Sequence, residues 1–303
     1  MAFAKRIFLF LAINFLVVIA ISALLSLFNV RPYLTQVGLD YQSLMIFCLI
    51  WGMGGALISL SLSRVMAKAL MGVKLIDPDT KDPAQRHLLN TVYALSRKAH
   101  LPEMPQVGLY ESPEVNAFAT GPTQRRSLVA ISRGLLNKMN QGEIEGILGH
   151  EITHVANGDM VTMTLVQGVV NAFVMFLARV LAYIFAGLGK DRRSGSGSSY
   201  ATYTIMVFVF EIAFMLLGSL LIAWYSRFRE FRADRGGAEL AGKDKMISAL
   251  KSLQQTMNQR DQKVEQPAFQ AFKISTPRKQ GLVWLFASHP PLEVRIERLE
   301  EMR

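Results

Sequence analysis

The stretch "GILGHEITHVANGDMVTMTLVQGVV", residues 146–170, joins two patterns that decide the fold. Its first half has apolar residues at helical spacing and ends in Asn157-Gly158, which is typical of the end of a helix. Its second half opens an apolar run long enough to cross a bilayer. The sequence therefore predicts a half-buried helix that is followed directly by a membrane helix.

Apolar segments of this length recur along the chain, and each reaches the roughly 20 residues that a helix needs to cross the hydrocarbon core. They span residues 6–28, 41–63, 160–189 and 200–226. Charged residues make up only 18% of the chain, whereas a soluble domain has about 25%. The first segment follows Lys5 and is longer than the roughly 7–15 apolar residues of a signal peptide, so we expect a retained anchor.

The basic residues indicate how these segments cross the membrane. The net charge is +10, but Lys and Arg flank the apolar segments and form no nucleic-acid motif, so we expect no nucleic-acid partner. Most lie beside the termini and beside two polar blocks, residues 64–159 and 227–303, which predicts that these regions are cytoplasmic. The basic connection 190–199 argues against this orientation. The single cysteine, Cys48, excludes a disulfide within the chain.

The polar blocks have mixed secondary structure. The first contains the strand-like pieces "PQVGLY", "VNAFAT" and "SLVAIS" before the helix "QGEIEGILGHEITHVAN". The second contains a polar stretch without periodicity, residues 256–280, which we interpret as a loop. We expect a mainly α membrane protein: four transmembrane helices with a cytoplasmic α+β domain assembled from two chain segments.

The opening stretch has the residues of a metal-dependent hydrolase. His150 and His154 are four apart, so both imidazoles project from one face of a helix, as one zinc ion requires. Glu151 can accept a proton from a metal-bound water, whose pKa zinc lowers to roughly 7. A chance arrangement on an ordinary amphipathic helix is the alternative.

A catalytic zinc needs a third protein ligand. The metzincin pattern is excluded because Asn157 and Met160 occupy its glycine and histidine positions. Asp159 remains open as a ligand. Glu230 is the better candidate, and Asp234, one turn later, can hydrogen-bond the outer nitrogen of a ligating histidine.

Two observations bear on the third ligand. The alternative for Glu230 and Asp234 is that they only balance the neighbouring arginines on a solvated face. However, the two apolar segments between His154 and Glu230 return the chain to the side that it left. The candidate ligands are therefore expected at the same membrane surface.

Four motifs together resemble those of the HtpX heat-shock metallopeptidases, membrane relatives of the CAAX prenyl proteases. They are "VNAFATG" (115–121), "HEITHVANGDM" (150–160), "EFRAD" (230–234) and "HPPLEVRI" (289–296), and the resemblance covers essentially the whole chain. It implies that the cytoplasmic α+β domain is a zincin-like catalytic domain. It also implies one zinc ion (Zn2+) per chain, bound by His150, His154 and Glu230, with Glu151 as the base.

The resemblance also implies residues that contact the substrate. It places Asn116 and Ala117 on an edge strand that pairs with an extended substrate, whereas the sequence alone favours a core strand. It implies that His289 and Arg295 are active-site auxiliaries, with His289 donating to the oxyanion. The alternative for His289 is a helix cap beside Pro290.

The same resemblance implies a biological role. The activity would be cleavage of misfolded or damaged membrane proteins at the cytoplasmic face of the bacterial inner membrane, in the company of other membrane quality-control proteases. A narrow-specificity processing protease and a non-catalytic adaptor are the alternatives. A transporter or channel is a further class, which the two large polar blocks fit poorly.

Two charged residues lie inside the apolar segments. An isolated charge at mid-bilayer costs at least about 2.5–3.5 kcal/mol. Arg179 and Glu211 are equally far from the centre of the connection 190–199, so an antiparallel hairpin would place them at one depth. We therefore expect them to pair. The alternative is that each faces a wet cavity or a polar neighbour such as Gln167 or Asn171.

Overall fold

The computed structural model describes residues 34–35, 38–188, 196–263 and 285–302. The expected segment 6–28 lies outside these residues. Two compact units share the chain: the helical unit, residues 1–61 and 162–222, and the α/β unit, residues 62–161 and 223–303. Each boundary between the units falls inside a helix.

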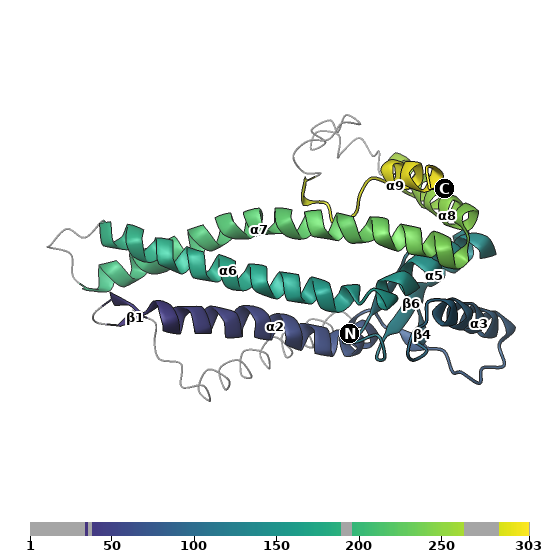
Figure 1. Cartoon of the computed structure of the whole chain (residues 1–303), viewed down its shortest axis with the longest axis horizontal. Helices are drawn as coiled ribbons and strands as arrows, with labels where there is room; N and C mark the ends of the chain where they lie inside the picture. Colours follow the sequence, from purple (N-terminus) through teal and green to yellow (C-terminus); the bar gives the residue numbers. More distant parts are fainter. Residues whose placement is uncertain (1–33, 36–37, 189–195, 264–284, 303) are drawn as a thin grey trace. The chain divides into compact units, whose positions relative to one another are not determined.

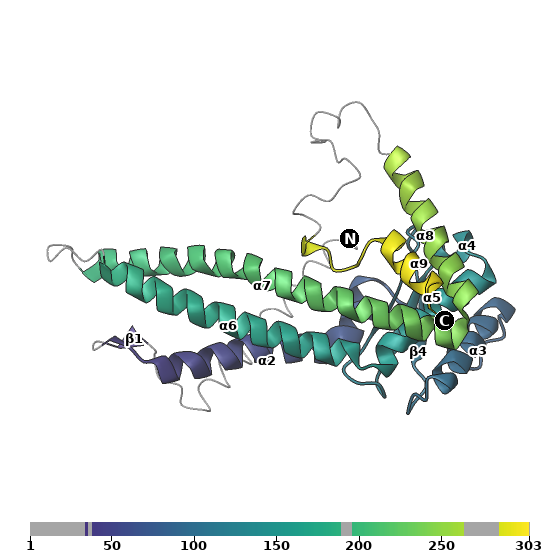
Figure 2. The same cartoon turned by 45° about the horizontal axis from the view of Figure 1, so that its top comes forward.

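The helical unit is built from parts of three long helices that lie side by side in both views (Figures 1 and 2). They are α2 (Tyr41–Leu70), α6 (Asp159–Leu188) and α7 (Ser196–Ala241). Within the described residues, these are the three helices that are long and apolar enough to cross a membrane. Large apolar side chains such as Phe173, Phe208 and Leu217 are 60–65% exposed, as expected for a surface that faces lipid.

Glycines let these helices approach one another closely. A Cβ added at Gly52 in α2 would lie 2.6 Å from the backbone nitrogen of Ala172 in α6. One at Gly168 would lie 2.6 Å from the sulfur of Met53. Because lipid provides no hydrophobic force between helices, such close packing is a main source of their association. A short antiparallel pair, β1 (Leu34–Thr35) and β2 (Gly38–Leu39), precedes α2.

The α/β unit contains a four-stranded sheet in the order β3-β4-β6-β5. The strands are β3 (Lys74–Leu75), β4 (Gln106–Tyr110), β5 (Ala117–Thr120) and β6 (Leu128–Ser132). β4 and β6 are parallel, and the other two pairs are antiparallel. β6 is buried along its whole length, which explains its uninterrupted apolar sequence. β5 forms an edge of the sheet.

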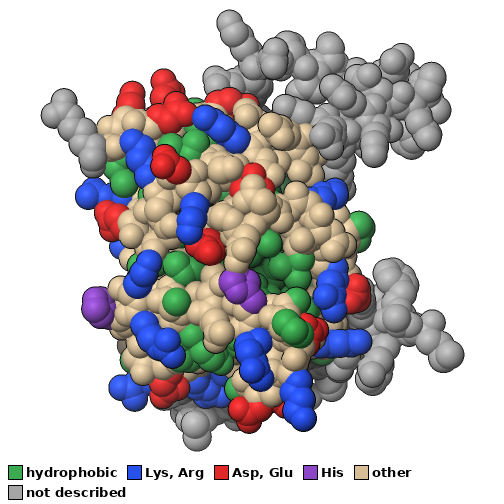
Figure 3. All heavy atoms as spheres, turned by 90° about the vertical axis from the view of Figure 1, so that its right-hand side faces the viewer, with side chains coloured by type: hydrophobic (Ala, Val, Ile, Leu, Met, Phe, Trp, Pro, Cys, Tyr) green, Lys and Arg blue, Asp and Glu red, His purple; other side chains and the backbone are tan. Residues whose placement is uncertain are grey.

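The α/β unit also contains shorter helices. They are α3 (Pro83–Lys98), α4 (Arg133–Lys138), α5 (Gln141–Ala156), α8 (Lys243–Lys263) and α9 (Leu292–Glu300). α5 packs against β5, α3 and α8, and its Leu148, Ile152 and Val155 are fully buried in the core. On the face drawn in Figure 3, acidic and basic side chains are interspersed, which is typical of a surface in water.

The expected elements are present, with two differences. The apolar segments 41–63, 160–189 and 200–226 lie in α2, α6 and α7, and the mainly helical fold is confirmed. However, α7 begins at Ser196, inside the expected connection 190–199 between two apolar segments. α8 continues to Lys263, so residues 256–263 of the expected loop are helical because Gln, Met, Arg and Lys favour helices even without an apolar stripe. Residues 264–280 of that loop lie outside the described residues.

Candidate metal centre

Helix α5 presents the histidine pair because both of its ends are well defined. Asn140 and Glu143 form a reciprocal capping box at its start. Gly158 follows its end with φ 65°, a conformation that favours glycine and separates α5 from α6. Between these ends His150 and His154 lie one turn apart, with their ring centroids 4.6 Å apart and their planes nearly perpendicular.

Helix α7 brings Glu230 to this pair by crossing α5 very closely. A Cβ added at Gly237 would lie 2.9 Å from the backbone nitrogen of His150, and one at Gly149 would lie 3.1 Å from the carbonyl oxygen of Gly237. Only glycines on both helices allow this approach. The sequence analysis does not predict this crossing. The feature that indicates it is the pair of adjacent glycines at 236 and 237.

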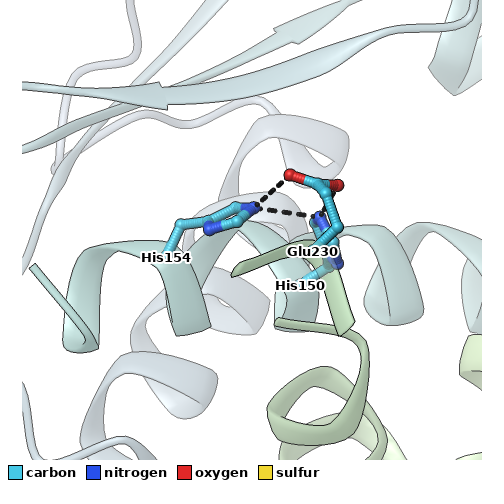
Figure 4. Close-up of side chains that lie close together, drawn as sticks. All are labelled: His150, His154 and Glu230. Atoms are coloured by element: carbon cyan, nitrogen blue, oxygen red, sulfur yellow. Dashed lines mark hydrogen bonds and ion pairs between the residues drawn. The ribbon is translucent and has the colours of Figure 1, made fainter. Parts of the chain in front are cut away.

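Three side chains converge where the helices meet (Figure 4). His150 Nε2 lies 3.1 Å from His154 Nε2 and 3.4 Å from Glu230 Oε2, and His154 Nε2 lies 3.3 Å from Glu230 Oε1. Zinc bonds of about 2.0–2.1 Å in tetrahedral geometry place neighbouring ligand atoms about 3.3 Å apart. Each of these separations is close to that value, with Glu230 facing His150 through Oε2 and His154 through Oε1. Two imidazoles and a carboxylate are donors that suit zinc.

A carboxylate holds the outer nitrogen of each histidine. His150 Nδ1 lies 3.0 Å from Asp234 Oδ1, and His154 Nδ1 lies 2.6 Å from Asp159 Oδ2. Both carboxylates are buried, so these contacts are shielded from water. Each histidine thus donates its Nδ1 proton outward and turns the lone pair of Nε2 toward the centre. Asp159, the alternative third ligand, lies on the outer side of His154 instead.

Arg295 supports one of these carboxylates. Its Nε donates to Asp234 Oδ2 at 2.8 Å and its Nη2 to Asp234 Oδ1 at 2.6 Å, a two-pronged contact between buried groups. Burial disfavours the charged guanidinium, but Asp234 outweighs burial and raises the pKa of Arg295. Arg295 thus reaches the centre through Asp234, and its Nη1 also lies 3.8 Å from Glu230.

The charges of the centre favour proton-binding histidines and ionised acids. Burial alone would raise the pKa of Glu230, but hydrogen bonds from the surrounding histidines hold it far below its usual range. Burial also opposes a charge on His154, yet Asp159 and Glu230 raise its pKa from 6.5 to about 9. A divalent cation must displace these protons to bind, because a histidine ligates a metal only in its neutral form.

His289 contacts the same carboxylate from the segment before α9. Its Nδ1 lies 2.9 Å from Glu230 Oε2, while most of its side chain is exposed. The structure therefore brings His289 and Arg295 to the candidate centre. α9 has no side-chain cap, so His289 is not the cap of this helix.

The edge strand β5 contacts Glu151. The backbone N–H of Ala119 donates to Glu151 Oε2 at 2.9 Å. Strand alternation then directs the backbone of Ala117 outward as well. The backbone of Asn116 faces inward, because its N–H and its carbonyl both bond to Ser132. A cavity of 640 Å³ lies beside these groups, and Asn116, Ala117, His150, Glu151, Glu230, His289 and Arg295 line it.

In the helical unit, the two intramembrane charges form an ion pair. Arg179 Nη1 donates to Glu211 Oε1 at 2.6 Å and to the carbonyl of Met175 at 3.1 Å. The guanidinium also lies 5.5 Å from the ring centre of Phe47. Gln167 and Asn171 hydrogen-bond to each other instead.

Known proteins resemble the chain over nearly its full length. Residues 83–303 match the model of Peptidase family M48. A protein named Protease HtpX homolog from Bacillus subtilis is 47% identical over 98% of this chain and 99% of its own. Protease HtpX from Thioalkalivibrio sulfidiphilus is 46% identical over 99% of both chains. The crystal structure of S. mikatae Ste24p has a TM-score of 0.62 at 17% identity, which shows a similar fold, and the match covers 98% of this chain and 64% of that one.

Proposed function

This chain belongs to peptidase family M48, and from that premise we propose that it is a zinc-dependent endopeptidase of the bacterial inner membrane. The family and the three apolar helices make it a membrane metallopeptidase. The observation that carries the proposal is the convergence of His150, His154 and Glu230, whose facing nitrogen and oxygen atoms lie 3.1–3.4 Å apart. We assign these residues as the ligands of one zinc ion per chain.

The mechanism follows from the groups around this site. When bound, zinc supplies an activated water with a pKa of about 7 and polarises the peptide carbonyl. Glu151 would act as the general base for the attacking water and would return the proton to the leaving nitrogen. Asp234 and Asp159 keep the Nε2 atoms of the two histidines directed inward. Arg295 holds Asp234 in place.

We assign the substrate to the edge of β5. An extended peptide adds to a free sheet edge through backbone hydrogen bonds, and the outward-facing backbone of Ala117 beside Glu151 provides such an edge. The side chain of Asn116, which lines the same cavity, contacts this peptide. His289 is exposed in the cavity and donates to the oxyanion as the tetrahedral intermediate forms.

We propose that its substrates are misfolded or damaged membrane proteins, cleaved at the cytoplasmic face together with other membrane quality-control proteases. The similarity to bacterial relatives named HtpX supports a location in a bacterial membrane. The basic residues beside the polar blocks support a cytoplasmic α/β unit and, with residues 6–28 as a further span, cytoplasmic termini.

Cleavage of several unrelated unfolded proteins by detergent-purified protein tests the activity. We expect that a chelator stops cleavage, that zinc restores it, and that Glu151→Gln lacks it. Cleavage that survives the chelator would contradict the proposal. Cutting of one protein at one defined site, with the others untouched, would instead favour a processing protease.

Protease treatment of spheroplasts tests the orientation. A tag at the C-terminus should resist an externally added protease and should be digested after lysis. Digestion in intact spheroplasts would contradict the cytoplasmic placement of residues 227–303.

A further inference from the structure

The cavity beside Glu151 has two chemically different walls. One wall is polar and consists of the candidate catalytic and metal-binding groups. The other wall is apolar, and residues from four helices and from the segment before β5 form it: Val115, Leu135, Ile147, Leu253, Met257 and Leu292. The chemistry described above uses only the polar wall.

The apolar wall begins directly beside the candidate base. Ile147 lies four residues before Glu151 on α5, so the two side chains share a face of the helix, with Cβ atoms about 5–6 Å apart. Ala117 of the edge strand lines the same cavity. Successive side chains of a peptide paired with β5 point in alternate directions, so one side chain near the cleaved bond enters the cavity.

The rim of the cavity adds a preference against acidic side chains. Gln254 Nε2 donates to Glu293 Oε1 at 2.8 Å, and both residues line the cavity. The carboxylate of Glu293 repels an incoming Asp or Glu. The apolar wall behind it offers no compensation for the desolvation of a charged or strongly polar group.

We propose that this apolar wall is a binding subsite for one large apolar side chain, such as Leu, Met or Phe, adjacent to the cleaved peptide bond. The proposal rests on the proposed peptidase function and specifies its substrate class. It means that the protein selects extended segments rich in large apolar residues. Such segments are abundant in membrane proteins and become accessible when these proteins lose their fold.

The test combines cleavage-site mapping with a variant that fills the cavity. Leu253→Trp, on α8, places an indole into the subsite. Gln255→Trp is the matched control, because Gln255 is exposed on α8 and lines a different hollow. Leu253→Ala enlarges the subsite and serves as a second variant if Leu253→Trp fails to fold, as judged by thermal unfolding.

We expect wild type and Gln255→Trp to cleave next to large apolar residues. In matched peptides, replacing that residue by Ala should lower kcat/KM by about tenfold or more. Leu253→Trp should lose this preference in favour of small residues, and Leu253→Ala should accept Trp better than wild type does. Cleavage without any preference for apolar residues, or identical preferences in Leu253→Trp and Gln255→Trp, would overturn the subsite.

A binding measurement separates this proposal from the peptidase function. Fluorescent peptides that differ only in Leu, Ala or Asp at the tested position are titrated into Glu151→Gln. If the Leu peptide binds more tightly than the Ala and Asp peptides, and the double variant Leu253→Trp/Glu151→Gln loses this difference, the subsite is supported. This holds even if wild type cleaves nothing. Equal binding of all three peptides contradicts it, whether or not wild type cleaves.

Discussion

Two groups of charged residues differ in how their charges are balanced. In the helical unit, Arg179 and Glu211 form one ion pair that is neutral by itself. In the α/β unit, three carboxylates, Asp159, Glu230 and Asp234, surround two histidines that face each other through their Nε2 atoms, and Arg295 pairs with Asp234. The first group needs nothing further. In the second, the three carboxylates outnumber the one guanidinium, and a divalent cation offsets this excess when the histidines are neutral. A neutral ion pair indicates a structural role for Arg179 and Glu211. An excess of carboxylates indicates a cation-binding site in the α/β unit.

The largest effect should come from the residue that performs chemistry in the second group. Glu151→Gln keeps the size of the side chain and removes the base, so kcat should fall by about 10²–10⁴-fold. The metal content should stay at the wild-type value because Glu151 is not a proposed ligand. Cleavage rates on one unfolded protein, with metal analysis of the same samples, measure both quantities. Near-normal kcat would mean that another group acts as the base.

Removing one partner of the neutral pair should destabilise the protein. Arg179→Leu leaves Glu211 without its ion-pair partner, which costs at least about 2.5–3.5 kcal/mol for a charge inside the bilayer. The double variant with Glu211→Leu removes both charges and should recover most of that loss. The level of folded protein in the membrane and its thermal unfolding in detergent measure the change. A double variant as unstable as the single one would mean that the two residues act separately.

Replacing both partners of the charged pair in the α/β unit, Asp234 and Arg295, should not restore zinc binding. Arg295 and Asp234 also form a paired contact, but Asp234 additionally holds His150. Asp234→Leu with Arg295→Leu should therefore bind zinc more weakly than wild type, by about 10–100-fold. Competition with a chromogenic chelator measures the affinity. If this variant binds zinc as tightly as wild type does, the pair of Asp234 and Arg295 is only structural, like the pair of Arg179 and Glu211.

A smaller effect is expected from one carboxylate alone. Asp159→Ala removes the partner of His154 Nδ1 without touching the inner ligand atoms, so zinc affinity should fall toward the lower end of the same 10–100-fold range. Asp79→Ala, an exposed position on a turn of the α/β unit, is the control. Complete loss of zinc in Asp159→Ala, with the fold intact, would indicate that Asp159 is itself a ligand.

The local parts of this account could be predicted from the sequence. The spacing of His150 and His154, the apolar segments and the strand-like pieces are short-range patterns, and the corresponding elements are present in the described residues. Residues 256–263 show the limit of such patterns, because their helix has little apolar periodicity. The absence of an apolar stripe predicts a loop at these residues, whereas the structure has a helix.

The tertiary parts of the site could not be derived in the same way. The position of β5 at the sheet edge depends on strand order, which the apolar character of "VNAFAT" does not determine. The position of Asp159 beside the outer nitrogen of His154 depends on how α6 starts after Gly158. The close crossing of α5 and α7 depends on glycines that are 88 positions apart, Gly149 and Gly237.

Zinc content of detergent-purified protein is the most direct test of a metal centre formed by His150, His154 and Glu230. Wild type, Glu151→Gln and Glu230→Ala are compared after the same purification, with thermal unfolding as the check of the fold. We predict about one zinc ion per chain in wild type and in Glu151→Gln, as a single three-ligand site requires, and loss of zinc in Glu230→Ala. Full zinc content in folded Glu230→Ala, or no zinc in folded wild type supplied with the metal, would contradict a centre formed by α5 and α7.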